Sequence, residues 1–288
     1  MKIANDWKDY QILRTGDGQK LERWKDVTLL RPDPQVIWHA QKDLRRCRFD
    51  ACYLRSETGG GHWEYERPIP QEWTVSWQDL KFKVKPMGFK HTGLFPEQAV
   101  NWAQMREMIA ASREPIRVLN LFAYTGGATV ACASRGAEVC HVDSARNMVE
   151  RARENMRLSG LESAPVRYIV DDCKKFVMRE IKRGRKYNAL IMDPPSYGRG
   201  PNGELWKIEE DLYDFVLLCK QVLENPKFVL INSYTTGLQP AVLQNVLTLM
   251  MKEFDGTTES YEVCLPTDEG IVLPCGASGM WRSKEITK

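Results

Sequence analysis

Three polar segments of the chain have residue types and spacing that suit binding of a small polar ligand and chemistry beside it. The first is the turn Thr125-Gly126-Gly127, which directly follows an apolar run over 116–122. The second is the carboxylate of Asp143, and the third is Asp193-Pro194-Pro195 with Tyr197 just after it. Because prolines fix the backbone and leave their carbonyl groups free, this last set predicts rigid hydrogen-bond acceptors for a donor-bearing ring, on which Tyr197 can stack.

The elements around the turn predict how the first two segments are positioned. The run over 116–122 has the length and branched side chains of a buried parallel strand. Small apolar residues over 128–135 predict a helix that ends at Gly136, and 137–142 predicts a second strand that ends at Asp143. This is a βαβ unit with a carboxylate at the tip of its second strand, and its two glycines let the backbone approach a ligand closely.

A strand-end carboxylate in a βαβ unit suits two cofactor classes, nicotinamide dinucleotides and S-adenosylmethionine (SAM). The turn discriminates between them. A pyrophosphate-binding turn has the pattern G-x-G-x-x-G, whereas Tyr124 stands at the first glycine position and no third glycine follows at the required spacing. SAM has a sulfonium cation and no phosphate, so it favours carbonyl and carboxylate groups over a helix N-terminus. The turn therefore favours SAM.

The remainder of the chain alternates between helix and strand periodicity. Helices are predicted over 96–112, 145–159, 173–183, 205–223 and 239–254, and strands over 166–170, 187–192, 228–232, 260–265 and 278–282. Alternation that ends in two strands without an intervening helix predicts an α/β fold: a seven-stranded, mostly parallel Rossmann-like sheet with an antiparallel edge hairpin. Asp143 and Asp193 then lie at the carboxyl ends of strands, where such sheets bind ligands.

Residues 1–90 have a different pattern and predict a small strand-rich domain, followed by a second domain over 91–288. Short alternating stretches at 27–31, 35–39, 73–77 and 80–85 are separated by Pro, Asp and Gly. Residues 1–90 contain 17 Lys and Arg against 13 Asp and Glu, and six of the nine tryptophans. Basic residues among aromatic ones suit RNA phosphates and bases, but tryptophans also suit the core of a small β domain. Both interpretations stay open.

Composition sets the outer limits. The 288 residues are 43% hydrophobic and 27% charged, as in ordinary globular proteins, with a net charge of +3. No apolar run has the length of a membrane span, and the first residues do not resemble a signal peptide. The eight cysteines form no C-x-x-C pair, so we expect no metal site and interpret them as reduced thiols of a cytoplasmic protein. The oligomeric state is not indicated.

From about residue 90 onward the chain resembles class I SAM-dependent methyltransferases, in particular the group that contains bacterial 23S ribosomal RNA large-subunit methyltransferases acting on cytosine C5 or guanine N7. The motifs that carry the resemblance are, in order, His91-Thr-Gly-Leu-Phe-Pro-Glu-Gln98, Leu119-Asn-Leu-Phe-Ala-Tyr-Thr-Gly-Gly127, Val142-Asp143, Asp171-Asp172 and Met192-Asp-Pro-Pro-Ser196. The resemblance implies SAM as the cofactor and RNA, in particular ribosomal RNA, as the substrate.

The resemblance also implies roles for individual residues. The methionine part of SAM would contact Ala123, Tyr124, Thr125, Gly126 and Gly127, and the ribose hydroxyls would contact Asp143, with Ser144 beside it. Asp172 would accept a hydrogen bond from the adenine amino group with Cys173 packed nearby, and Phe95 and Gln98 would cover the cofactor. The catalytic set would be Asp193, Pro194, Pro195 and Tyr197. From the residues alone, Asp143 also suits a solvated turn, Asp172 a helix N-cap, and 193–195 a strand terminated by prolines.

One segment departs from the relatives that methylate cytosine C5. Those enzymes carry a nucleophilic cysteine just after the strand predicted at 228–232, because an unactivated ring carbon must first be made electron-rich by covalent attack. This chain has Ser233, Tyr234 and Thr235 there, and no cysteine follows Pro195 closely. We therefore predict methyl transfer by direct in-line attack of a nitrogen or oxygen, which requires mainly placement of the nucleophile.

The sequence predicts SAM-dependent methylation of an RNA base in ribosomal RNA, and three alternatives stay open. They are a methyltransferase acting on a small molecule or protein, a dinucleotide-dependent oxidoreductase, and a non-catalytic RNA-binding protein with the same fold. The glycine-rich segment over 198–204 suits a mobile lid over the substrate or a plain connector.

Overall fold

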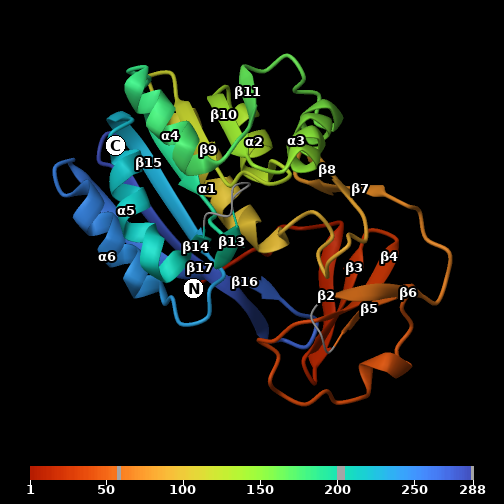
Figure 1. The fold of residues 1–288 in the computed structure, drawn as a ribbon. Coiled ribbons are helices and arrows are strands. Elements are labelled where there is room, and N and C mark those ends of the chain that lie inside the picture. Colours follow the sequence, from red (N-terminus) through yellow and green to blue (C-terminus); the bar gives the residue numbers. More distant parts are fainter. Residues whose placement is uncertain (57–59, 200–204, 287–288) are drawn as a thin grey trace. The chain divides into compact units, whose positions relative to one another are not determined.

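The computed structural model describes residues 1–56, 60–199 and 205–286, and it divides into two compact units (Figure 1). Unit 1 comprises Met1–Val100 and Val263–Cys275, and unit 2 comprises Asn101–Glu262 and Gly276–Lys288. The first unit therefore extends ten residues beyond the boundary expected at residue 90, and it also takes in a segment near the end of the chain. The assignment of separate domains to 1–90 and 91–288 stays a prediction.

The main sheet has the strand order β1-β16-β17-β15-β12-β9-β10-β11. Its strands are β9 (Arg117–Leu121), β10 (Glu138–Asp143), β11 (Val166–Val170), β12 (Tyr187–Met192), β15 (Leu223–Ser233), β16 (Gly256–Pro266) and β17 (Val272–Ser283). Neighbouring strands from β11 to β15 are parallel, and β17 is antiparallel to β15. This confirms the mostly parallel sheet with antiparallel strands at one edge. The two-residue strand β1 (Lys2–Ile3) additionally pairs with Val263 and Cys264, within unit 1.

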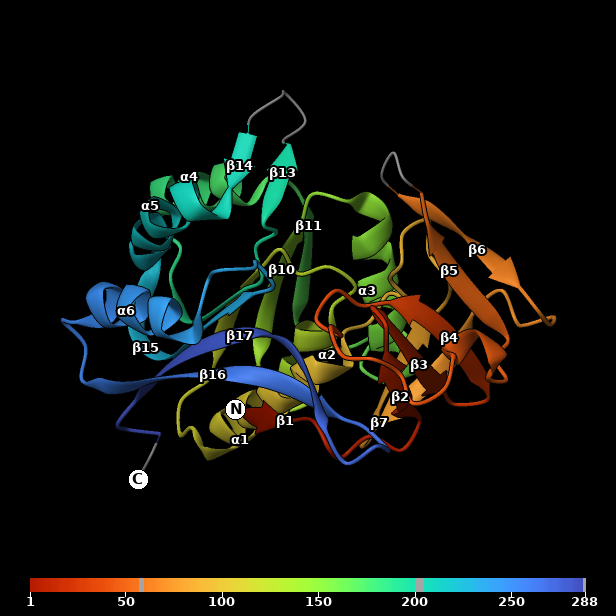
Figure 2. The same cartoon turned by 90° about the horizontal axis from the view of Figure 1, so that it is seen from below.

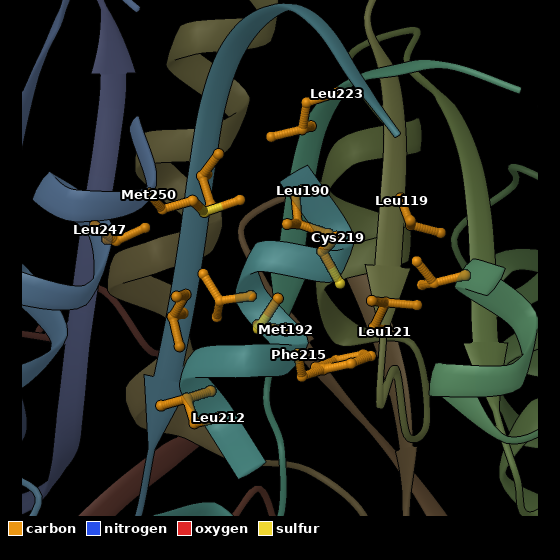
Figure 3. Packing of buried hydrophobic residues seen from close by; sticks show 14 of the residues in the cluster. Leu119, Leu121, Leu190, Met192, Leu212, Phe215, Cys219, Leu223, Leu247 and Met250 are labelled. Atoms are coloured by element: carbon orange, nitrogen blue, oxygen red, sulfur yellow. The ribbon is translucent and has the colours of Figure 1, made fainter. Parts of the chain in front are cut away.

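Helices cover both faces of this sheet. They are α1 (Ala99–Ala111), α2 (Gly127–Ala133), α3 (Arg146–Leu158), α4 (Cys173–Lys182), α5 (Ile208–Lys220) and α6 (Pro240–Met251). Figures 1 and 2 show α4, α5 and α6 on one face and α1, α2 and α3 on the other. Figure 3 shows the core beneath α5 and α6, where strand residues such as Leu190 and Met192 meet Phe215 and Met250. Burial of this apolar surface fixes the strands, and hence the loops at their carboxyl ends.

The predicted helix over 205–223 is wrong at its beginning. Leu205–Lys207 is a strand, β14, paired with β13 (Tyr197–Arg199), and the helix α5 starts at Ile208. The Asp211 carboxylate accepts a hydrogen bond from the Lys207 N–H at 2.8 Å, and acidic residues in the first turn favour a helix start here. The Trp206 ring packs against the rings of Phe122 and Phe215 at 5.6 and 5.7 Å, so tertiary packing determines this boundary.

Unit 1 is rich in strands, as predicted. Its larger sheet contains β2 (Tyr10–Gly16), β3 (Gln19–Trp24), β4 (Val27–Pro32), β5 (Ala51–Arg55) and β6 (Gly61–Tyr65), and β7 (Trp73–Trp77) pairs with β8 (Leu80–Val84). The strand predicted over 35–39 is wrong. That segment lies across the β2–β3 turn, where the Val36 and Trp38 carbonyls accept hydrogen bonds from Gly18 and Asp17. Its alternating pattern arises from side chains that pack on the turn.

The six tryptophans of residues 1–90 pack within unit 1. Trp24 and Trp77 are fully buried. The other four are half-buried and donate their indole N–H groups to oxygens of the same unit: Trp7 to Pro96 O at 2.9 Å, Trp38 to Thr15 Oγ1 at 3.0 Å, Trp63 to Met87 O at 2.8 Å and Trp73 to Trp24 O at 3.0 Å. Burial of two rings and internal hydrogen bonds of the other four support the structural interpretation of these residues.

Candidate cofactor and substrate site

The sheet order brings four of the predicted polar segments into one row within unit 2. Strands β12, β9, β10 and β11 are neighbours, with Met192 and Val142 both paired with Leu121 and with Asp143 paired with Val170. Their carboxyl ends lie at the same edge because the strands are parallel. Asp193 follows β12, the turn over 122–127 follows β9, Asp143 ends β10, and Asp171-Asp172 follows β11.

The turn after β9 has an unusual backbone conformation. Phe122, Tyr124 and Gly126 have φ angles of 54°, 49° and 81°, and the left-handed region is strained for the two aromatic residues. Hydrogen bonds hold the turn at three points. Ala123 N donates to Val142 O at 3.0 Å, Tyr124 N donates to Asp143 Oδ2 at 2.8 Å, and Asn155 Nδ2 donates to Thr125 O at 2.8 Å. Backbone strain held by surrounding contacts is typical of binding sites.

The two glycines of the turn were predicted to let the backbone approach a ligand, and they also have a role in packing. A Cβ atom on Gly126 would lie 2.7 Å from the Cβ of Ala152 in α3, and one on Gly127 would lie 2.6 Å from the ring of Trp102 in α1. Such contacts are too short for carbon atoms. The missing side chains therefore let α1 and α3 pack against the turn.

The Asp143 carboxylate organises the turn. Its Oδ2 accepts from Tyr124 N and its Oδ1 accepts from Ala145 N at 2.9 Å. Burial raises the pKa of this carboxyl above its ordinary value, while the two hydrogen bonds lower it. Since each carboxylate oxygen has a second lone pair, Asp143 keeps acceptor capacity for a ligand. Ser144 is exposed beside it.

Asp172 and Cys173 begin α4. The Asp172 side chain caps the helix by accepting from Lys175 N at 2.9 Å, so the N-cap interpretation is confirmed. Its second oxygen accepts no hydrogen bond from the part of the chain that the structure describes, and this leaves it available to a ligand. The Cys173 sulfur accepts from Phe122 N at 3.3 Å, and burial raises the pKa of this thiol. Cys173 is therefore a neutral packing and positioning group.

The segment after β12 is held by two contacts with other elements of unit 2. Trp206 Nε1 donates to Pro195 O at 2.6 Å, and Ser196 Oγ forms a hydrogen bond with Thr235 Oγ1 at 2.6 Å. The expectation that both proline carbonyls are free is thus wrong for Pro195, because Trp206 from β14 reaches it. Among described residues the Pro194 carbonyl accepts no hydrogen bond, and it joins the half-buried Asp193 as an acceptor.

Tyr197 begins β13 and its side chain is 54% exposed, which suits stacking against a base. The predicted lid spans 198–204, and residues 200–204 lie outside the described residues.

Two predicted cofactor contacts, Phe95 and Gln98, belong to unit 1. Gln98 is buried and Phe95 is half-buried, with the Phe95 ring centroid 5.3 Å from that of His91. Their assignment as a cover over the cofactor stays a prediction.

A buried polar network fixes the carboxyl end of β15. Asn101 Nδ2 donates to Asn232 Oδ1 at 3.1 Å and to Ser278 Oγ at 2.9 Å, and Tyr261 Oη donates to Asn101 Oδ1 at 2.7 Å. These four side chains come from α1, β15, β17 and β16 and are all buried. Because hydrogen bonds link all four side chains, the network specifies one arrangement of these elements. It thereby positions Ser233, Tyr234 and Thr235, which follow Asn232.

The sequence analysis missed several residues that shape the site: Phe122, Asn155, Trp206 and the Asn101 network. The sequence could have indicated Asn155, because this polar residue stands on the apolar face of α3 between Ala152 and Met156. All three residues are buried. A buried asparagine at a core position needs a partner, and here the partner is Thr125 O.

In the described ranges no three His, Cys, Asp or Glu side chains are placed to hold a metal ion, and no helix is long and apolar enough to cross a membrane. The expectation of no metal stays a prediction.

A parallel sheet with this strand order, a strained turn after β9 and carboxylates after β10 and β11 define the SAM-dependent methyltransferase class. Comparison with known families agrees: residues 38–238 match the model of the S-adenosylmethionine-dependent methyltransferase family. The chain belongs to this family.

Individual relatives support the same assignment. The crystal structure of a SAM-dependent methyltransferase from Agrobacterium tumefaciens has a TM-score of 0.90 and 31% identity, covering 96% of this chain and 91% of that one. Ribosomal RNA large subunit methyltransferase I of Klebsiella pneumoniae is 30% identical over 160 residues, 55% of this chain and 38% of that protein. A Methanocaldococcus jannaschii protein named for the same class is 36% identical over 198 residues, 68% of this chain and 47% of that protein. The chain thus spans less than half the length of these two curated relatives.

SAM is the cofactor, and the hydrogen-bond acceptors of the site fit it. A methyltransferase structure of 17% identity with a TM-score of 0.76, which shows the fold alone, was solved with S-adenosylhomocysteine. SAM offers an amino group on adenine, two ribose hydroxyls and a cationic sulfur, all of which favour acceptors. Asp143 and Asp172 offer such acceptors at neighbouring strand ends, with an uncommitted oxygen on Asp172.

Proposed function

We propose that the protein transfers the methyl group of SAM to a nitrogen or oxygen of a base in large-subunit ribosomal RNA, by direct in-line attack. The observation that carries the mechanism is the contact of Ser196 with Thr235 at 2.6 Å. It brings the segment after β15, where cytosine-C5 enzymes carry their cysteine, against the Asp193-Pro194-Pro195 segment. The side chains available there are hydroxyls, which favours transfer without a covalent enzyme intermediate.

Each cofactor contact is a separate part of this proposal. Asp143, with Ser144 beside it, binds the ribose hydroxyls, and the uncommitted oxygen of Asp172 accepts from the adenine amino group beside Cys173. The methionine part lies against the strained turn from Ala123 to Gly127, and Phe95 and Gln98 cover the cofactor. The support is the placement of the unit 2 acceptors at adjacent strand ends.

The substrate side follows from the acceptors after β12. When bound, SAM supplies a methyl group already activated by the sulfonium charge, so placement of the nucleophile is the main requirement. The Asp193 carboxylate and the Pro194 carbonyl accept hydrogen bonds from an N–H edge of the base and orient the nitrogen lone pair. Asp193 then takes the proton released from that nitrogen, and Tyr197 stacks on the ring.

Two observations support RNA as the substrate. The Klebsiella pneumoniae relative is named for ribosomal RNA. In unit 1 the side chains of Lys42, Arg45, Arg46 and Arg48 are exposed around the short helix η1 (Leu44–Arg46), and a cluster of this kind suits phosphate contacts. A ribosomal substrate places the enzyme in the cytoplasm, and eight free cysteines suit that reducing compartment.

A small molecule or a protein is the second candidate substrate. The observation that favours it is that the tryptophans of residues 1–90 other than Trp7 pack within unit 1, which weakens one of the two RNA-binding signals of that segment.

The test is transfer of radiolabelled methyl from SAM to RNA, protein and small-molecule fractions of cells that lack the gene. We expect label in large-subunit ribosomal RNA with the wild-type protein and much less label with Asp143→Ala at a SAM concentration near the wild-type Kd. Label confined to another fraction would replace RNA by that substrate.

A second experiment tests the mechanism with 5-fluorocytidine-containing RNA. We expect no covalent protein–RNA complex on a denaturing gel. A complex that survives denaturation would show that a cysteine attacks the base, and would overturn direct transfer.

A further inference from the structure

Unit 1 contains a pocket of about 280 Å³ that none of the residues discussed for methyl transfer lines. Its walls come from the segment before β2, from β2 and β3, and from the end of β16 and the turn after it. The lining residues that matter for its chemistry are Asn5, Trp7, Tyr10, Gln11, Arg23 and Asp268. Ligand pockets have volumes of roughly 300–1,000 Å³, so this one suits a single small ring system.

Two aromatic rings line the pocket. The rings of Trp7 and Tyr10 lie 6.1 Å apart at 71° to each other. Their polar atoms point to partners inside unit 1, since Trp7 Nε1 donates to Pro96 O and Tyr10 Oη donates to the buried Glu22 carboxylate at 2.8 Å. What Trp7 offers to the pocket is therefore ring surface, which binds other flat rings, whereas Tyr10 is only 4% exposed and packs edge-on against the Trp7 ring.

The polar side of the pocket is uncharged overall. Gln11 Nε2 donates to Asp268 Oδ1 at 2.6 Å, and Arg23 donates to Gln11 Oε1 from Nε at 3.3 Å and from Nη2 at 3.0 Å. Arg23 also donates to the carbonyls of Lys25 and Lys8. All three guanidinium nitrogens of Arg23 therefore already donate hydrogen bonds. The negative charge of Asp268, which is linked to Arg23 through Gln11, compensates the positive charge of Arg23. A phosphate would find no uncommitted cation among the lining residues, which excludes the backbone of a nucleic acid as the occupant.

One side chain of the pocket has hydrogen-bonding capacity to spare. The Asn5 amide is exposed and forms no hydrogen bond with the described part of the chain. An amide offers two donors and an acceptor, the combination that reads the edge of a nucleobase. Ring surface beside an amide, without a free charge, matches a flat, neutral, hydrogen-bonding ring.

We propose that this pocket binds one unstacked base of the RNA substrate, a base other than the one that is methylated. The proposal rests on RNA being the substrate. Trp7 supplies the stacking surface and is held by its contact with the Tyr10 ring, Asn5 reads the base edge, and the Arg23–Gln11–Asp268 chain keeps the opposite wall rigid. RNA-binding proteins commonly recognise single-stranded segments by stacking splayed bases in this way.

The test measures methylation kinetics with a ribosomal RNA fragment for the wild type, Asn5→Ala, Trp7→Leu and the control Gln35→Ala. Gln35 is exposed in unit 1 and does not line the pocket. Since stacking of one base contributes on the order of a tenfold change in affinity, we expect KM for RNA to rise about tenfold in Trp7→Leu and about threefold in Asn5→Ala. We expect kcat and the Kd for SAM to stay unchanged in Asn5→Ala, since Asn5 forms no hydrogen bond with the described part of the chain.

Abasic nucleotides placed singly along the fragment provide the specific readout. With the wild type, one position away from the methylated base should raise KM, and with Trp7→Leu the same substitution should have no further effect. If Trp7→Leu has a lowered unfolding temperature, the variant Asn5→Ala provides the same test, because its threefold rise in KM should disappear with the RNA that carries the abasic nucleotide at that position.

Three outcomes would overturn the proposal. If the wild type methylates no RNA, the proposed function fails and the pocket proposal fails with it. If the wild type methylates RNA while both pocket variants keep the wild-type KM, only the pocket proposal fails. If free adenosine, guanosine, cytidine or uridine binds the wild type at micromolar concentration and Trp7→Leu does not bind it, the pocket is a nucleoside site instead of an RNA site.

Discussion

At the scale of single residues, Asp143 has two roles that one substitution would remove together. It accepts hydrogen bonds from Tyr124 and Ala145, and in the function that we propose it also binds the ribose hydroxyls of SAM with its remaining lone pairs. Hydrogen bonds to a charged group contribute about 1.5–3 kcal/mol each, so Asp143→Ala should weaken SAM binding by at least tenfold, measured by isothermal titration calorimetry. Glu138→Ala, at the exposed opposite end of β10, is the control. An unchanged Kd would remove Asp143 from the cofactor site.

Gly126 combines a left-handed backbone conformation with a close contact to Ala152. Substitutions at Gly136 and Ala152 separate the cost of the backbone strain from the cost of the clash. Gly126→Ala should cost about 1–2 kcal/mol for the φ of 81° and a further 1–3 kcal/mol for the clash with Ala152. Gly136→Ala, with φ of 85° and open space around it, should show the first cost alone. Gly126→Ala combined with Ala152→Gly should relieve the clash. Chemical denaturation measures all four proteins, and equal losses for Gly126→Ala and Gly136→Ala would contradict the clash.

His141 makes stability depend on pH. It is fully buried, bonds Thr129 Oγ1 through Nδ1 at 2.9 Å, and burial lowers its pKa to about 3. The unfolded chain has the ordinary value near 6.5, so only the unfolded state takes up the proton between these pH values. The contribution is fully present above pH 6.5 and decreases by about 1.4 kcal/mol per pH unit below it.

His141→Asn keeps an acceptor near the Nδ1 position and does not titrate. The loss of unfolding free energy between pH 7.5 and 5.5 should therefore be about 1.4 kcal/mol smaller than in the wild type. Denaturant titrations at the two pH values measure it, and parallel losses would show that His141 is protonated in the folded protein.

At the scale of elements, the Ser196–Thr235 hydrogen bond couples the segments that follow β12 and β15. If it positions the substrate acceptors, Ser196→Ala and Thr235→Ala should each lower kcat about two- to tenfold, and the double variant should be no worse than either single one. Thr235→Ser should restore the activity, and the Kd for SAM should not change. Additive losses in the double-mutant cycle would mean that the two hydroxyls act independently.

Element boundaries show what a single sequence can predict. Strands β9, β10 and β12 and their terminal polar residues were predicted because each is a short apolar run ended by a turn or a carboxylate. The predicted helix over 205–223 missed β14, because Leu205–Lys207 is a strand only through pairing with Tyr197–Arg199 and through packing of Trp206. The hydrogen bond of Asn155 with Thr125 likewise depends on where α3 packs.

At the scale of the whole molecule, the sequence predicted a change of architecture near residue 90 but missed the return of the chain to unit 1. Val263–Cys275 joins unit 1 through pairing of β1 with Val263 and Cys264, a bridge between Ile12 and Thr267, and hydrogen bonds of Thr15 with Glu269. These contacts join residues about 250 positions apart and leave no local pattern.

This arrangement predicts the behaviour of fragments. A protein that consists of 1–100 alone lacks the partner of β1 and a wall of the Trp7 pocket, so it should unfold at a lower temperature than unit 1 does in the full chain. Hydrogen exchange of Ala4 N–H, which donates to Cys264 O at 3.0 Å, measures the loss directly. Equal protection of Ala4 in the fragment and the full chain would contradict the prediction.

The order of synthesis gives the long strand β16 a further consequence. Unit 1 begins at the first residue of the chain, yet it cannot close until Val263–Cys275 has left the ribosome. The main sheet has the same property, since β17 lies between β15 and β16 and is synthesised after both of them. Both units therefore emerge with incomplete sheets, and unpaired strand edges are prone to aggregate. Neither unit is protected until Val263–Cys275 and β17 have been translated, so production should respond to slower translation and to chaperones that shield nascent strands.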